Sequence, residues 1–152
     1  MSWLEVDNTI NQFNSLAIGI DTGVNTGFAS WSISAQQFSE IKTYMIHQAT
    51  RRIEALINEG YNIHVRVEDA RKAVYGRSND KYKAQGAGSV KRDAKIWEDF
   101  LIDLGVSFEM VRPQKGKTKL TSQQFSKLTK YTGRTSQHGR DAGMIVFGTT
   151  RI

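Results

Sequence analysis

The sequence contains no cysteine and only one proline, and its apolar runs are short. Without cysteine, the chain forms neither disulfides nor thiolate metal sites. No apolar run approaches the ~20 residues that a membrane-spanning helix needs, so we expect no membrane partner. The first fifteen residues, MSWLEVDNTINQFNS, lack the basic end and apolar stretch of a secretory signal. These absences predict a cytoplasmic protein.

Basic residues are unevenly distributed along the chain of 152 residues, whose net charge is +6. Lys and Arg far outnumber Asp between residues 71 and 95, and residues 112–134 contain Lys and Arg but no acidic residue. Such segments suit a polyanion, because each neutralised phosphate releases counterions. They also suit a well-solvated surface. Tyr75, Tyr82 and Tyr131 lie among these cations and favour nucleic acid, since exposed aromatic rings stack on bases.

The hydrophobic pattern predicts three strands at the start of the domain. Residues 16–21 form an apolar run typical of a buried strand, and residues 26–34 and 38–46 alternate between apolar and polar positions. Short turns join them, so we expect an antiparallel meander. The spacing of Gly19, Gly23 and Gly27 indicates backbone that turns tightly or is approached closely.

The remaining pattern alternates helices and strands. We expect a helix over 47–60, a strand over 61–69, a helix over 88–104, a strand over 106–113, and helices over 121–131 and 135–149. Two basic loops, 70–86 and 114–120, interrupt this order. The order predicts an α/β fold with a mixed five-stranded sheet and helices on both faces. We find no repeat and no domain boundary, so one domain spans 1–152, with residues 1–14 as an extension that the pattern does not place.

Three carboxylates occur at positions where burial is costly. Asp21 ends the apolar first strand, and Glu68 ends the strand NIHVRVE. Asp141 lies on the last helix in a stripe with Met144 and Ile145, which we expect to be buried. Because acids are rarely buried without a partner, a divalent cation such as Mg²⁺ would explain all three. His138, three residues before Asp141, shares its helix face.

Each acid also has a simpler interpretation when it is taken alone. Asp21 before Thr22 and Gly23 suits a turn. Glu68 suits an ion pair with a nearby arginine, and Asp141 suits the first turn of a helix. A lone histidine is more often structural or exposed than catalytic. Asp69 faces the other side of its strand from Glu68, so we interpret it as a structural acid.

Four motifs follow one another in a characteristic order: IGIDTGVNTGFASW, VRVEDAR with a long loop and AGSV, RPQKGK, and HGRDAGMI. Over about residues 15–150 they resemble the RuvC-type Holliday junction resolvases, and more closely the bacteriophage-type members than the bacterial enzyme. The resemblance implies an RNase H-like fold. For a phage-encoded member it also implies the cytoplasm of a bacterial host.

The resemblance implies a metal-dependent endodeoxyribonuclease that cleaves phosphodiester bonds at four-way DNA junctions. In that family two Mg²⁺ ions, for which Mn²⁺ can substitute, are held at positions matching Asp21, Glu68, His138 and Asp141. Many relatives have Asp at the position of His138, whose role is either ligand or activator of the attacking water. A lysine that acts at the scissile phosphate matches Lys117 best and Lys115 next.

The resemblance also implies DNA contacts and a homodimer. Residues expected to contact DNA are Arg71, Lys72, Tyr75, Arg77, Lys81, Tyr82, Lys83, Lys115, Lys117 and Lys119. Of these, Tyr75, Arg77 and Tyr82 would enter or prop open the branch point. Two symmetric cuts require two copies of the site, and helix 88–104 is the candidate interface. Trp97 within it is explained more simply as core.

Three other hypotheses fit part of this pattern. A related nuclease would act on flaps, forks or RNA–DNA hybrids with the same acids and different loops. A kinase or ATPase of the actin and sugar-kinase type shares the GIDTGVNTG hairpin but needs two such domains. A non-catalytic DNA-binding module would keep the basic loops and would not need the acids.

Overall fold

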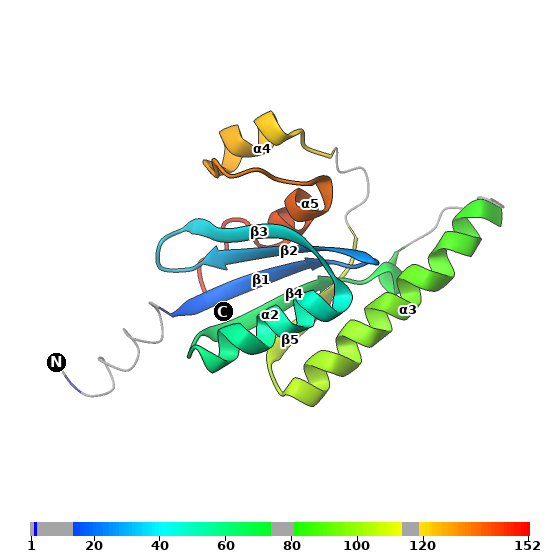
Figure 1. Ribbon diagram of the computed structural model, residues 1–152, viewed down its shortest axis with the longest axis horizontal. Helices are drawn as coiled ribbons and strands as arrows, with labels where there is room; N and C mark the ends of the chain where they lie inside the picture. Colours follow the sequence, from blue (N-terminus) through cyan, green and yellow to red (C-terminus); the bar gives the residue numbers. More distant parts are fainter. Residues whose placement is uncertain (1, 3–13, 74–80, 114–118) are drawn as a thin grey trace.

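The computed structural model describes residue 2 and residues 14–73, 81–113 and 119–152, with the backbone alone for residues 81–87. The elements are β1 (Ser15–Asp21), β2 (Asn25–Ser32), β3 (Gln37–Met45), α2 (Ile46–Asn58), β4 (Asn62–Glu68), the 3₁₀ turn η1 (Ala70–Lys72), α3 (Lys81–Leu104), β5 (Ser107–Val111), α4 (Ser122–Thr129) and α5 (Gln137–Val146). They form one five-stranded sheet in the order β3-β2-β1-β4-β5 (Figure 1).

The sheet is mixed, as the sequence pattern predicts. β1, β2 and β3 pair in antiparallel order, whereas β4 runs parallel to β1 and β5 runs parallel to β4. A parallel neighbour requires a crossover, and α2 and α3 supply the two crossovers. This α/β architecture is the RNase H-like arrangement that we expected.

Helices cover both faces of the sheet, and each face has its own core. On one face, side chains of α2 and α3 pack on β1 and β4, around Ile18, Val65 and Trp97. On the other face, α4 and α5 pack on β1, β2 and β3, around Ala29, Phe38, Phe125, Ala142 and Val146. Because neighbouring residues of a strand point to opposite faces, β1 sends Ile18 and Ile20 toward α2 and α3 and its alternate residues toward α5.

α5 lies directly on the backbone of β1 and β2. A Cβ atom at Gly19 would lie 2.1 Å from the carbonyl oxygen of Ala142, and one at Gly27 would lie 1.9 Å from that of His138. Gly23 has a φ of +154°, which allows the tight turn between the two strands. The predicted close approach and turn are therefore confirmed, and they bring α5 against the end of β1.

Several predicted boundaries are wrong. Residues 81–86 belong to α3 and not to the loop expected over 70–86. Lys, Ala and Gln in this stretch favour a helix, but its apolar period begins only at Val90 and two glycines obscure the helical signal. α4 ends at Thr129, where Lys130 adopts a left-handed φ of 65°. α5 ends at Val146, and Gly148 adopts a φ of +80°.

Two aromatic residues have clear structural roles. Trp97 is fully buried between α3 and the sheet, which confirms its place in the core. Tyr131 is half-buried against the other core and packs edge-on against Phe38. The expectation that Tyr131 is exposed for stacking on bases is therefore wrong. Within the described residues, no helix combines the length and apolarity needed to cross a bilayer.

Candidate active site

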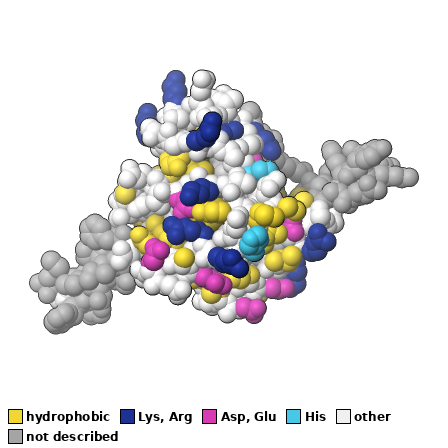
Figure 2. Space-filling model, in the orientation of Figure 1, with side chains coloured by type: hydrophobic (Ala, Val, Ile, Leu, Met, Phe, Trp, Pro, Cys, Tyr) yellow, Lys and Arg dark blue, Asp and Glu magenta, His cyan; other side chains and the backbone are white. Residues whose placement is uncertain are grey.

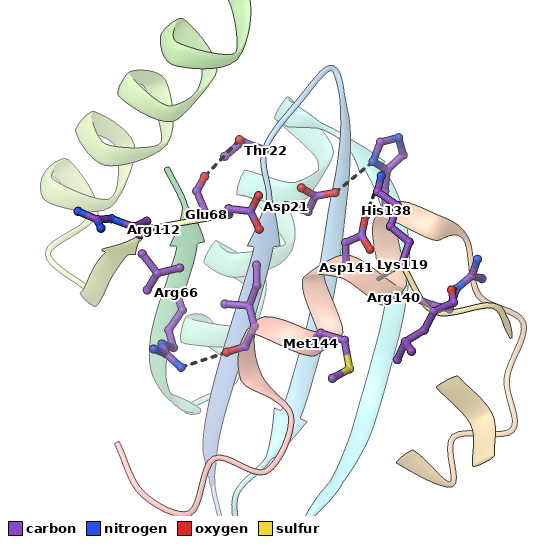
Figure 3. Close-up of a pocket in the computed structure, with 13 residues that line it drawn as sticks. Asp21, Thr22, Arg66, Glu68, Arg112, Lys119, His138, Arg140, Asp141 and Met144 are labelled. Carbon is purple, nitrogen blue, oxygen red and sulfur yellow. Dashed lines mark hydrogen bonds and ion pairs between the residues drawn. The ribbon is translucent and has the colours of Figure 1, made fainter. Parts of the chain in front are cut away.

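A pocket of about 420 Å³ opens at the carboxyl ends of β1 and β4, beside α5. The parallel pairing of these two strands, in register from Ser15 with Asn62 to Ile20 with Val67, brings their next residues, Asp21 and Glu68, to the same edge. α5 adds His138 and Asp141, which lie on the opposite side of Asp21 from Glu68 (Figure 3). The complete lining is Asp21, Thr22, Arg66, Glu68, Val111, Arg112, Lys119, Leu120, His138, Arg140, Asp141, Met144 and Ile145.

Asp21 is a largely buried carboxylate in this pocket. Its side chain is 17% exposed, and burial raises its pKa above the usual 3.8. The hydrogen bond from His138 lowers the pKa, the negative charge of Asp141 raises it, and Lys119 lowers it. Burial and the charge of Asp141 together outweigh the effects of His138 and Lys119 on this pKa. Holding Asp21 ionised in the absence of a bound cation is therefore costly.

α5 has a well-defined start, which positions His138 and Asp141. Ser136 caps the helix by accepting a hydrogen bond from the backbone N–H of Gly139, at 3.0 Å. One turn inside the helix, Asp141 accepts a hydrogen bond from Gln137, and its Oδ2 atom lies 3.6 Å from the Nζ atom of Lys119. Asp141 is thus beyond the first turn, and a cap-type role does not explain it.

The expectation that Asp141, Met144 and Ile145 form the buried stripe of α5 is wrong. The buried residues are Gly139, Ala142, Gly143 and Val146, which follow the same spacing two positions earlier. Asp141, Met144 and Ile145 border that stripe and are half-buried. Small residues form the buried face because α5 lies so close to the strands. The neighbouring stripe is therefore left to line the pocket.

Glu68 lies on the pocket side of β4, opposite the buried face of Ile63, Val65 and Val67. Its carbonyl oxygen accepts a hydrogen bond from Thr22 Oγ1 at 3.3 Å, which ties the ends of β1 and β4 together. Arg66 on the same face donates to Glu109 at 3.1 Å and to the carbonyl of Ile145 at 3.0 Å.

Basic side chains lie at the rim of the pocket. Lys119 lies on the α5 side, and Arg112 lies beyond Glu68 on the β5 side (Figure 3). Arg140 donates to the carbonyls of Leu120 and Thr135 at 3.0 and 2.8 Å and so fixes the segment that carries Lys119. On the face over α2, by contrast, acidic and basic side chains are interspersed (Figure 2).

Arg112 and Arg140 were missed by sequence reasoning. Arg112 follows the end of β5, at the sheet edge where Asp21 and Glu68 also lie. Arg140 directly precedes Asp141. Arg112 could have been identified as a site residue by its place at a strand end, and Arg140 by its place beside a candidate metal ligand.

The expected DNA-contacting residues fall into four groups. Tyr75, Arg77, Lys115 and Lys117 lie outside the described residues, and for Lys81, Tyr82 and Lys83 the backbone alone is described, within α3. Lys119 lies at the pocket. Arg71 and Lys72 bind within the protein instead: Arg71 pairs with Asp69 and Glu98, and Lys72 donates to the carbonyl of Met110 at 2.8 Å. Both side chains thus have partners within the protein, and their contact with DNA stays a prediction.

The donor set fits a hydrated divalent cation. Asp21, Glu68 and Asp141 offer carboxylate oxygens to one space, and Asp21 is a buried carboxylate whose charge a cation would stabilise. Among the described residues, no three Asp, Glu or His side chains lie close enough together to hold a metal ion as they stand. Mg²⁺ commonly binds through one or two carboxylates and keeps several waters, which suits such an open arrangement.

No protein-family model matches the chain, and no curated protein matches it significantly.

Proposed function

We propose that this protein is a metal-dependent, structure-selective endodeoxyribonuclease that cleaves phosphodiester bonds at four-way DNA junctions. One observation carries the proposal: carboxylates from β1, β4 and α5 meet in one pocket of an RNase H-like fold, beside basic side chains. The resemblance of the sequence motifs to RuvC-type resolvases narrows the substrate to branched DNA.

The acidic residues and the histidine of the pocket would have different roles. Asp21, Glu68 and Asp141 would hold Mg²⁺, with Asp21 in the central place because it lies between the other two (Figure 3). When bound, such ions supply Lewis acidity and a water of lowered pKa for in-line attack on a phosphodiester. His138 would act either as a further ligand or by taking a proton from that water.

The basic rim would bind and orient the DNA backbone. Lys119 lies beside Asp141 and would offset negative charge at the phosphate that undergoes cleavage. Arg112 on the other side of the pocket has an exposed side chain suited to a neighbouring phosphate. Cleavage of both strands of a junction requires two such pockets, so the proposal includes a homodimer.

The test is a cleavage assay with Mg²⁺ on a mobile four-way junction, beside linear duplex, flap and RNA–DNA hybrid substrates. Asp21→Asn is the inactive variant, and Glu54→Gln, which neutralises an exposed acid of α2 outside the pocket, is its matched control. We expect paired symmetric nicks in the junction for the wild type and for Glu54→Gln, and none for Asp21→Asn.

Two other outcomes would point to other functions. Equal cutting of flaps and junctions would indicate a nuclease with broader branched-DNA specificity. Binding of the junction without cutting of any substrate would indicate a non-catalytic DNA-binding module and would overturn the proposed activity.

A further inference from the structure

The residues that follow Glu68 form an unusually complete set of ion pairs. Arg71 donates from Nε and Nη2 to the two carboxylate oxygens of Asp69, at 2.9 and 2.8 Å, and its backbone N–H donates to Asp69 Oδ1 at 3.0 Å. The side chain of Asp69 is only 2% exposed. The buried carboxylate of Asp69 is thus paired with the guanidinium of Arg71 through both of its oxygens.

The same guanidinium reaches a second element. Arg71 Nη2 and Nη1 lie 3.1 and 3.4 Å from the two carboxylate oxygens of Glu98 on α3. A planar guanidinium that binds two carboxylates fixes their relative position more tightly than a lysine would. We call Asp69, Arg71 and Glu98 the Arg71 bridge, which joins the end of β4 to α3.

Further bonds attach this segment to β5. The backbone N–H of Asp69 donates to the carbonyl of Val111 at 2.8 Å, and Lys72 Nζ donates to the carbonyl of Met110 at 2.8 Å. The residues directly after Glu68 are thus fixed to α3 and β5. On the pocket side, Thr22 bonds to the carbonyl of Glu68 itself.

This arrangement has a consequence for the position of the Glu68 carboxylate. Asp69 and Glu68 are neighbours that point to opposite faces, so rotation or translation of Asp69 moves Glu68 as well. Interactions that orient metal ligands commonly change metal affinity by 10- to 100-fold when they are removed. An ion-pair set that served stability alone would not need to adjoin a residue of the pocket.

We propose that Arg71 is a positioning residue for Glu68: through Asp69 it sets where the Glu68 carboxylate meets the metal, and through Glu98 it makes that position depend on α3. The inference rests on the proposed function, since it assumes that Glu68 binds Mg²⁺. Asp69 adjoins Glu68 in the chain, whereas Glu98 reaches Glu68 only through Arg71 and Asp69. Loss of Glu98 should therefore have the smaller effect.

The test compares three variants by metal binding in the absence of DNA. Arg71→Lys keeps the positive charge and loses the planar guanidinium, and Glu98→Gln removes only the negative charge of Glu98 on α3. Arg52→Lys is the matched control, because Arg52 pairs with Glu40 at 2.9 Å, is similarly exposed (34% against 30% for Arg71) and lies outside the pocket. Thermal unfolding is followed across a Mg²⁺ titration, and Mn²⁺ binding is measured by isothermal titration calorimetry.

We expect Arg71→Lys to raise the Mg²⁺ concentration for half-maximal stabilisation about tenfold, and Glu98→Gln to raise it by less. Arg52→Lys should lower the unfolding temperature without changing the metal dependence. An unchanged metal dependence in both Arg71→Lys and Glu98→Gln, with lowered unfolding temperature, would overturn the inference and leave a stabilising role alone. A wild type that binds no metal would instead overturn the proposed function itself.

Discussion

The Nδ1 atom of His138 lies 3.1 Å from the Oδ2 atom of Asp21, although 117 positions separate the two residues in the chain. When Asp21 is ionised its carboxylate only accepts hydrogen bonds, so in that state Nδ1 of His138 carries a hydrogen and donates the hydrogen bond to Asp21. In the neutral ring Nε2 is then left with a lone pair, available to a metal or to a water proton. The His138 side chain is 49% exposed, so Nε2 can meet a substrate in the pocket.

The first prediction concerns the role of His138. We expect His138→Ala to lower the rate of junction cleavage about 100-fold, the usual size of a lost proton-transfer group or ligand. His138→Asp should recover much of that rate if the residue is a ligand, because a carboxylate also binds Mg²⁺. If Nε2 takes a proton, His138→Asp stays as slow as His138→Ala. Single-turnover cleavage at saturating Mg²⁺ measures all three proteins.

A control for this prediction is DNA affinity, measured in Ca²⁺ by electrophoretic mobility shift. Neither variant should change it, because His138 does not belong to the basic rim. A wild-type cleavage rate in His138→Ala would exclude any catalytic role for this side chain.

The second prediction concerns the burial of Asp21. Because burial raises its pKa, the charged form of Asp21 destabilises the native state at neutral pH when no cation is bound. We expect Asp21→Asn to stabilise the metal-free protein by on the order of 1 kcal/mol, and to abolish the stabilisation that Mg²⁺ gives to the wild type. Urea unfolding at pH 7, with EDTA and with Mg²⁺, measures both effects. Equal stabilisation of both proteins by Mg²⁺ would contradict binding at Asp21.

The fold was largely predictable because its signals are local. The apolar run of β1, the alternation of β2 and β4, and the period of α2 each indicate their element, and their order restricts the sheet to few topologies. The placement of Asp21 and Glu68 follows from the same reasoning, since both residues end parallel neighbours of one sheet.

The remaining parts depend on contacts that no local pattern encodes. The buried face of α5 is set by the glycines of β1 and β2, which admit a helix backbone and select small residues such as Ala142. The sequence alone did not show that Arg71 pairs with Asp69 and Glu98, because Glu98 lies twenty-seven residues away in the chain. Long-range pairing of this kind is decided by tertiary structure.

The third prediction concerns a polar cluster at the sheet edge, away from the pocket. Tyr44 donates a hydrogen bond to Glu40, which also pairs with Arg52. Burial, together with the bond to Glu40 and its negative charge, raises the pKa of Tyr44 to about 12. The native state thus retains this proton longer than the unfolded chain, so stability decreases as pH rises from about 10 to 12. The ultraviolet titration curve of Tyr44→Phe is subtracted from that of the wild type, and the difference should show ionisation of Tyr44 near pH 12.

Glu40→Gln tests the stated cause of this shift. Removing the charge should lower the pKa of Tyr44, because burial then acts without the negative charge of Glu40 while Arg52 still lowers the pKa. A titration midpoint near 10 in the wild type would show that the Tyr44–Glu40 bond does not persist in solution.

The last prediction tests the contact between α5 and the sheet. Gly27→Ala places a methyl group where the carbonyl oxygen of His138 lies, at 1.9 Å, and neither backbone can move without breaking the packing of α5. We expect a loss of stability of about 3 kcal/mol or more, at the upper end for an overpacked site. Because the carbonyl belongs to His138, the same change separates that residue from Asp21. Any folded fraction should therefore also cleave junctions more slowly.

Gly88→Ala is the matched control, since a Cβ atom at Gly88 meets nothing within 4 Å on α3. Alanine favours a helix over glycine by about 0.5–1 kcal/mol, so this variant should be more stable than the wild type. Urea unfolding followed by circular dichroism compares the two variants. A Gly27→Ala protein as stable as the wild type would mean that α5 is farther from β2 in solution, and the shared site of Asp21 and His138 would lose its structural basis.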